Sequence, residues 1–315
     1  MKKLAKRPRK YISSLVRGIR QRLRRSKYAE WRDSQLSAPA LDVSLRHGAG
    51  RNLILGVATG YDFSVLLPFV RSLRRFIDCR AMLVVDDESV ARQLDLEGID
   101  SVIANPERGY TPHINFARAG LLHRTLLALA GQIDWVFFLD TRDVVFQADP
   151  FKVLPPADII FFRESEGSTF RTSNRNRSWL IGTFGEKWLP VLGDQELLCG
   201  GTILAQYEAA VLLCKLKLLL GAMVPDERHA APGVDQMTTN MIARLGLIPR
   251  SIAMPHDQLV ATLSQANRDF LVSAGEDLFL NRSGKLPAII HQYDRVPEIQ
   301  RTILHRYASA VPGSR

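Results

Sequence analysis

Residues 134–146 read DWVFFLDTRDVVF, and this stretch decides the fold that we expect of the whole chain. Its continuous apolar run, Trp135 to Leu139, is typical of a strand buried on both faces. The run ends at Asp140, and Asp143 follows three positions later. Ligands of open α/β sheets bind beyond the carboxyl ends of strands, where two carboxylates can hold Mg²⁺ or Mn²⁺. A polar turn after a core strand fits the same residues, so the metal site is a hypothesis at this point.

Similar apolar runs recur on both sides of this stretch and alternate with helical patterns. This alternation is typical of a mostly parallel sheet with helices on its faces. We therefore predict an α/β fold with a single Rossmann-like domain over residues 51–295. The predicted strands are 52–58, 81–85, 101–104, 135–139 and 158–162, and the predicted helices between them are 63–77 and 114–130.

Further strands also end on polar groups. The first runs into Thr59-Gly60-Tyr61-Asp62, the second into Asp86, and a late strand at 288–290 into His291. The first strand is followed by neither G-x-G-x-x-G nor a P-loop, so the phosphates of a nucleotide would need another partner. A metal on the two carboxylates would provide one, and a histidine would add a nitrogen ligand, although a lone histidine at a strand end is usually structural.

Two later segments are candidates for ligand contacts. Gly200 and Gly201, followed by Thr202, precede a predicted strand, and paired glycines permit close approach of a ligand to the backbone; a plain turn fits equally well. Asp235 and Gln236 lie near the start of a predicted helix, opposite its apolar face. There the acid suits the helix dipole, and both side chains can hold sugar hydroxyls. The polar stretch 163–177 has the length of a lid beside a site.

The net charge of +10 comes from one segment. Residues 1–33 hold 13 of the 42 Lys and Arg residues but only 2 of the 32 acids. Between Tyr11 and Arg25 an apolar stripe faces arginines, which predicts a basic amphipathic helix. The apolar stripe favours binding to an anionic membrane surface over binding to nucleic acid. No aromatic residues interleave with the charges, as binding to single-stranded nucleic acid would require. A solvated tail is the third interpretation of the arm. Residues 34–50 have the composition of a linker, so 1–50 is predicted to be arm and linker, and 296–315 a C-terminal helix or tail.

The sequence also indicates in which cellular compartment we expect the protein. No apolar run approaches the ~18 residues of a membrane span, and no signal-peptide pattern is present. Cys79, Cys199 and Cys214 are odd in number and widely spaced, which favours core thiols and a reducing environment. We expect a cytoplasmic protein that is peripheral on the inner face of the membrane.

Taken in order, these motifs resemble those of GT-A type glycosyltransferases, with a layout similar to the family 8 retaining enzymes. That family has a nucleotide-binding first strand, an Asp-x-Asp after a buried strand, an Asn-Ser-Gly-type turn, an Asp-Gln helix start and a late metal-binding histidine. The matching positions are Thr59–Asp62, Asp140–Asp143, Gly200–Thr202, Asp235 with Gln236, and His291. Residues 142–151 and 291–295 also resemble a group of bacterial and plant GT-A-like proteins.

Within residues 52–295, which the resemblance covers, the chain departs from the family pattern in three places. The acid pair is D-x-x-D, so Thr141 can stand where the first acid stands, leaving Asp143 as the surer ligand. The turn has Cys in place of Asn, and no Lys-Pro-Trp follows the histidine.

The resemblance implies a metal-dependent transferase that moves a sugar, with retention of configuration, from a nucleotide diphosphate sugar to a glycan or lipid-linked acceptor. The donor would most often be a UDP-sugar. The implied roles are Mn²⁺ or Mg²⁺ binding by Asp140, Asp143 and His291, donor nucleotide binding by Thr59, Tyr61, Asp86, Gly200, Gly201 and Thr202, and catalysis by Asp235 and Gln236, which would hold the sugar.

Two alternatives belong to other classes. One is a catalytically inactive GT-A-like binding module tethered to membrane or nucleic acid by the basic arm. The other is a phosphatase of the haloacid dehalogenase type, because Phe138-Leu139-Asp140 also begins that motif. That family needs D-x-D at the end of its first strand, so both the spacing and the position are unfavourable here.

Overall fold

The computed structural model describes residues 26–104, 112–263, 271–273 and 278–308. The strands are β1 (Ala49–Val57), β2 (Cys79–Val85), β3 (Asp100–Ile103), β4 (Trp135–Leu139), β5 (Val144–Phe146), β6 (Ile159–Arg163), β7 (Leu198–Gln206), β8 (Ser251–Met254), β9 (Val260–Thr262), β10 (Leu271–Ser273), β11 (Phe279–Asn281) and β12 (Ile289–His291). The α-helices are α2 (Lys27–Ser37), α3 (Phe63–Phe76), α4 (Glu88–Leu96), α5 (Ile114–Ala128), α6 (Asn174–Phe184), α7 (Leu189–Leu192), α8 (Tyr207–Leu220), α9 (Val234–Arg244) and α10 (Pro297–Tyr307).

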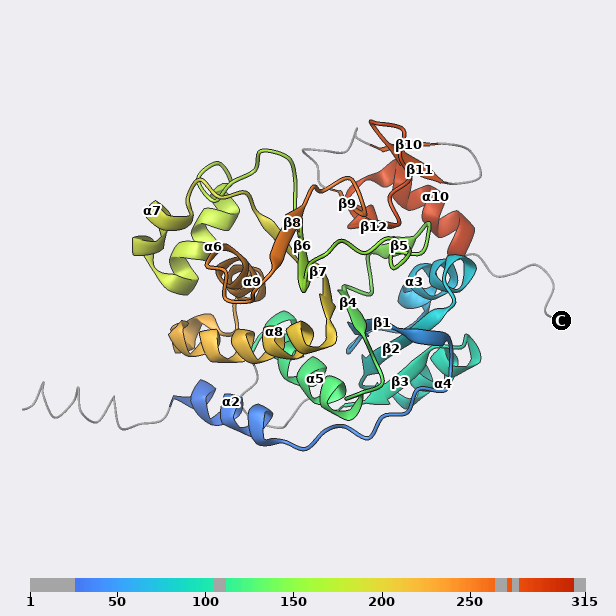
Figure 1. Ribbon diagram of the computed structural model, residues 1–315, viewed down its shortest axis with the longest axis horizontal. Coiled ribbons are helices and arrows are strands. Elements are labelled where there is room, and N and C mark those ends of the chain that lie inside the picture. Colours follow the sequence, from blue (N-terminus) through green and yellow to red (C-terminus); the bar gives the residue numbers. More distant parts are fainter. Residues whose placement is uncertain (1–25, 105–111, 264–270, 274–277, 309–315) are drawn as a thin grey trace, which may run out of the picture.

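A seven-stranded sheet forms the centre, with the strand order β3-β2-β1-β4-β7-β6-β8 (Figure 1). Its neighbouring strands are parallel, except that β7 is antiparallel to β4 and β6. The predicted α/β fold with a mostly parallel central sheet is therefore confirmed.

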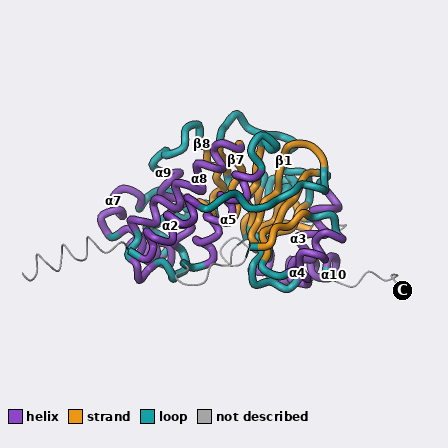
Figure 2. Tube along the Cα trace, turned by 90° about the horizontal axis from the view of Figure 1, so that it is seen from below, coloured by secondary structure: helices purple, strands orange, loops and turns teal. Residues whose placement is uncertain are grey.

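Helices cover both faces of this sheet. Leu53 and Leu55 of β1 pack in a core with residues of α5 and α8, whereas Ile54 packs with residues of α3 and α4. Successive side chains of a strand point to opposite faces, so a strand covered on both faces needs a continuous apolar run. Figure 2 shows the strands between two groups of helices, with α2, α8 and α9 on one side and α3, α4 and α10 on the other.

Strand β7 corrects the prediction for Gly200 and Gly201. Both glycines lie inside the strand, not in a turn before it. Since β7 runs opposite to β4, its beginning lies beside the end of β4: Thr202 pairs with Leu139, and the amide of Asp140 donates to the Gly201 carbonyl at 2.8 Å. The two glycines therefore sit at the same sheet edge as Asp140.

The strand that ends at His291 lies outside the central sheet. β12 is the middle strand of a separate sheet with the order β5-β12-β9. β5 begins directly after Asp143, and it pairs antiparallel to β12 with His291 opposite Val144. This pairing, and not a shared rim of the central sheet, brings His291 to Asp143.

Helix α2 occupies part of the segment that was predicted to be arm and linker. The Ser26 hydroxyl caps it by accepting a hydrogen bond from the Ala29 amide. Tyr28 and Trp31 are three residues apart, so they share a face, and both are buried. The Tyr28 hydroxyl donates to the Leu218 carbonyl of α8 at 2.5 Å. Residues 26–37 are thus part of the folded body, and the connection to β1 is shorter than predicted.

The amphipathic helix predicted for residues 11–25 lies outside the described residues. Within the described part of the chain, no helix has the length and apolarity needed to cross a membrane.

Candidate metal centre

Backbone pairing fixes the two ends of this site. Asp140 follows the last residue of β4, and Asp143 precedes the first residue of β5. The Asp143 carbonyl accepts a hydrogen bond from the Gln292 amide at 2.7 Å. Gln292 itself adopts a left-handed conformation with φ of 59°, which is uncommon for a residue other than glycine and often marks a functional site. This hydrogen bond and the pairing of β5 with β12 therefore hold the loop 140–143 against the end of β12.

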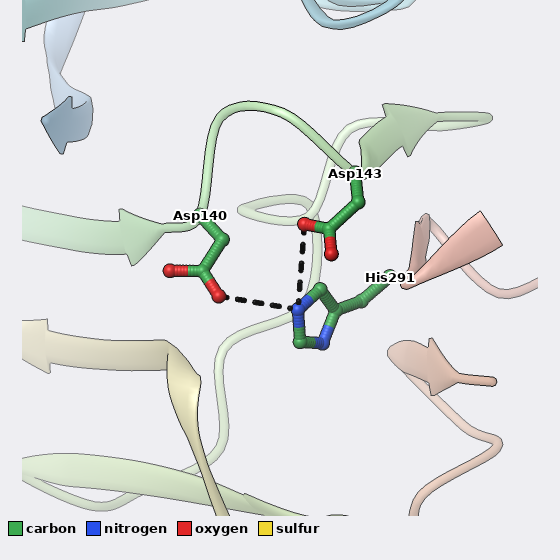
Figure 3. Close-up of side chains that lie close together, drawn as sticks. All are labelled: Asp140, Asp143 and His291. Carbon is green, nitrogen blue, oxygen red and sulfur yellow. Dashed lines mark ion pairs between the residues drawn. The ribbon is translucent and has the colours of Figure 1, made fainter. Parts of the chain in front are cut away.

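Three side chains converge between these elements (Figure 3). Asp140, Asp143 and His291 each offer a ligand atom, and these atoms lie within 4.8 Å of one another. His291 Nε2 is 3.5 Å from Asp140 Oδ2 and 3.8 Å from Asp143 Oδ1. The three predicted metal ligands are thus brought together, although His291 and Asp143 are 148 positions apart.

The surroundings of the three side chains fit a cation. His291 is 0% exposed and Asp143 8%, whereas the side chain of Asp140 is 32% exposed and gives the site an open side. Among the described residues, His291 Nε2 makes no hydrogen bond, although it is buried and faces two carboxylates. Buried polar atoms are nearly always satisfied, so this nitrogen and the two carboxylates together suit a divalent ion.

Burial and the charges of neighbouring groups shift the pKa values of all three side chains. Burial would lower the pKa of the His291 imidazole, but Cys199 and Asp140 outweigh it and raise that pKa well above 6.5. Burial would raise the pKa of the Asp140 carboxyl, but Arg118 and His291 hold it well below its ordinary range. Burial raises the pKa of Asp143. In the metal-free protein a proton on His291 can therefore bridge the carboxylates, and a divalent cation would replace it.

A chain of buried charges, which sequence reasoning missed, connects this site to Asp235. Arg118 donates through Nη1 to Asp140 Oδ1 and through Nη2 to Asp235 Oδ2 at 2.7 Å. Lys217 Nζ donates to the other Asp235 oxygen at 2.6 Å. Both oxygens of Asp235, a predicted catalytic residue, are thus bound to cations, which suits an orienting role better than that of a free nucleophile.

The sequence did hold a signal for these two cations. Leu122 lies one turn after Arg118 in α5 and is buried, and Leu213 and Cys214 lie one turn before Lys217 in α8 and are buried too. A charged residue in line with buried apolar neighbours needs a partner, because a buried charge is costly unless it is paired. The identity of the partner could not be read from the sequence.

The paired glycines accommodate the carboxylates of the site. A Cβ at Gly201 would overlap the Asp140 carboxylate, and one at Gly200 would lie 3.1 Å from Asp235 Oδ2. The groups that approach these glycines closely are therefore side chains of the protein itself. Thr202, predicted to contact the nucleotide, is fully buried.

Gln236 points to a different set of partners. Its amide nitrogen donates to Glu164 Oε2 at 2.8 Å and to Asn176 Oδ1 at 3.1 Å. Glu164 follows β6, and Asn176 lies in α6, which begins at Asn174 within the stretch predicted as a lid loop. Gln236 thus ties α9 to this stretch.

Tyr61 and Asp86 line a pocket at the sheet edge where Asp140 lies. The pocket has a volume of about 720 Å³ and is lined from the ends of β1 and β2 by Gly60, Tyr61, Asp62, Phe63, Ser64, Asp86, Asp87, Ser89, Val90 and Gln93. Thr59 does not line it. β1 is the neighbour of β4 in the sheet, so the pocket and Asp140 share one edge. Asp86 is held in place because it accepts hydrogen bonds from the Gly60 amide at 2.9 and 3.1 Å.

No protein-family model matches this chain, and no curated protein matches it significantly. The geometry of the site is therefore the only guide to its function.

Proposed function

We propose that this protein is a metal-dependent glycosyltransferase of the GT-A type that uses a nucleotide diphosphate sugar, most often a UDP-sugar, as donor. The observation that carries the proposal is the convergence of Asp140, Asp143 and His291 at the carboxyl end of β4, with ligand atoms within 4.8 Å of one another. Ligands of α/β sheets bind at this edge. The layout similar to the family 8 enzymes supports retention of configuration.

The donor set favours Mn²⁺ or Mg²⁺. Two carboxylates and an imidazole form a mixed oxygen and nitrogen set, which suits Mn²⁺ better than Ca²⁺. Three protein ligands leave other coordination positions for phosphate oxygens. When bound, such an ion acts as a Lewis acid that stabilises charge on a leaving diphosphate.

The surrounding residues also favour an anionic ligand. With a divalent ion bound and His291 neutral, Asp140 and Asp143 balance the charge of the ion. Arg118 and Lys217 then outnumber Asp235, so the site keeps a net positive charge. Arg118 holds Asp140 through one carboxylate oxygen, while the other faces His291.

The pocket at the same sheet edge would hold the nucleoside. Its volume of about 720 Å³ lies within the range of small-molecule sites. Tyr61 and Phe63 offer aromatic surface for a base, and the Asp86 and Asp87 carboxylates can accept hydrogen bonds from ribose or base. The acceptor would be a glycan or a lipid-linked glycan, because the basic arm suits an anionic membrane surface on the cytoplasmic side.

The test is a screen of nucleotide sugars with and without Mn²⁺. We expect a UDP-sugar to raise the melting temperature only when metal is present, since a ligand that binds the native state stabilises it. Sugar release should then follow in the wild type and be lost in Asp143→Asn and in excess EDTA. Asp194→Asn is the matched control, because Asp194 is exposed and pairs with Arg171. Turnover that persists in EDTA, or no metal-dependent shift with any nucleotide, would refute the proposal.

One observation favours a second candidate, a binding module without turnover. Both predicted catalytic residues already have protein partners: Asp235 binds Arg118 and Lys217, and Gln236 binds Glu164. Metal-dependent nucleotide binding without sugar release, for every donor and acceptor tested, would select this candidate.

A further inference from the structure

The two ring nitrogens of His291 have different surroundings. Nε2 faces the carboxylates of Asp140 and Asp143. Nδ1 lies on the opposite side of the ring, 3.4 Å from Thr262 Oγ1 and 3.6 Å from Cys199 Sγ. Both of these partners are buried. The imidazole is therefore held between an acidic side and a side with a thiol and a hydroxyl.

Cys199 and Thr262 come from different sheets and are fixed by the backbone. Thr262 is the last residue of β9 and pairs directly with His291 in β12. Cys199 lies in β7 of the central sheet, and its sulfur accepts a hydrogen bond from the Gly201 amide at 3.4 Å. The ring of His291 thus lies where the two sheets meet.

A neutral imidazole carries one N–H donor and one lone pair. If Nδ1 carries the proton, it can donate to the sulfur or the hydroxyl, and the Nε2 lone pair then points at the carboxylates. A lone pair that faces two carboxylates is favourable only when a cation lies between them. Histidines that bind metal commonly donate their other N–H to such an acceptor, which fixes tautomer and ring orientation.

From this geometry we infer that Cys199 and Thr262 are positioning residues, which hold His291 with Nε2 directed at the cation shared with Asp140 and Asp143. This inference rests on the proposed metal-dependent function. It gives a role to Cys199, which the sequence indicates only as a core thiol, and to Thr262, which no motif includes.

The test uses matched pairs of variants in the full chain. Thr262→Val keeps the shape of the side chain and removes the hydroxyl, whereas Thr262→Ser keeps the hydroxyl. Cys199→Ala removes the sulfur, whereas Cys199→Ser keeps a hydrogen-bonding group. Mn²⁺ affinity is measured by calorimetry, and urea denaturation in EDTA reports the stability of each variant separately.

We expect Thr262→Val and Cys199→Ala each to weaken Mn²⁺ binding several-fold and their combination to weaken it about 10- to 100-fold. The serine variants should stay close to wild type.

The outcomes separate this inference from the proposed function. If wild type binds no Mn²⁺, the metal centre fails and the inference with it. If wild type binds Mn²⁺ and the double variant binds it equally well, only the inference is overturned. Serine variants as weak as Cys199→Ala and Thr262→Val would also overturn it, because packing and not hydrogen bonding would then be responsible.

Discussion

Replacing Lys217 by methionine tests the buried charge chain most directly. The side chains of Lys217 and Asp235 are 8% and 6% exposed, and their ion pair measures 2.6 Å. Lys217→Met keeps the length of the side chain but leaves one oxygen of Asp235 buried without a cation. Arg118 still binds the other oxygen. The variant should therefore fold, with a lower free energy of unfolding.

The magnitude follows from burial. Removing one partner of a buried ion pair destabilises a protein by about 3–5 kcal/mol, and we expect about 3 kcal/mol because Arg118 remains. Asp235→Asn leaves Lys217 unpaired and should also be destabilising. In the double variant neither charge of this pair remains, so its loss should be smaller than the sum of the single losses by about 1–3 kcal/mol.

Urea denaturation at neutral pH in EDTA measures all three variants. Lys215→Met is the control, because Lys215 lies in the same helix and is exposed, so its effect should stay within about 0.5 kcal/mol. A Lys217→Met variant as stable as this control, or strictly additive losses in the double variant, would refute the reasoning that the pair is buried and coupled.

Three further predictions concern the metal centre and the arm. Gly201→Ala should displace the Asp140 carboxylate and weaken Mn²⁺ binding about tenfold or more, equal to about 1.4 kcal/mol; calorimetry that finds wild-type affinity would contradict the close packing. Because the folded pKa of His291 is raised, its contribution to the stability of the metal-free protein should be complete below pH 6.5 and lost as pH rises through the folded pKa. Urea denaturation in EDTA across this range should show the loss in wild type but not in His291→Gln. A chain that starts at Ser26 keeps α2 and should sediment with anionic vesicles less than the full chain does; equal sedimentation would exclude the arm as the membrane contact.

Most secondary structure could be predicted from the sequence, because it depends on local periodicity. The runs at 52–58 and 135–139 and the helical spacing at 63–77 match β1, β4 and α3 within a few residues. The polar residues that follow strands were equally visible, and they predicted Asp140, Asp143 and His291 as ligands, three side chains that the structure brings within 4.8 Å of one another. Such signals lie within one turn or one strand, and burial on one or two faces determines them.

Other features depended on contacts between distant segments. The apolar pattern of a strand does not encode its direction, so the antiparallel course of β7, which places Gly201 against Asp140, was not visible. An apolar run also does not specify which sheet the strand joins. Strand β12 pairs with β5 in a sheet separate from the central one. Helix α2 lies in the segment predicted to be arm and linker from its basic charge and its loop-like composition, yet Tyr28 and Trp31 are buried and the Tyr28 hydroxyl binds the Leu218 carbonyl of α8.

In the candidate site, too, some features could be predicted from the sequence and others depended on the tertiary structure. The sequence alone indicated the two carboxylates and the histidine as candidate metal ligands, because each follows an apolar run. Only the tertiary structure decided their neighbours: Arg118 and Lys217 on Asp235, and Cys199 and Thr262 on His291. These partners are 18 to 117 positions apart along the chain. Charge pairing and hydrogen bonding select them by distance in space, and local sequence patterns carry no information on that distance.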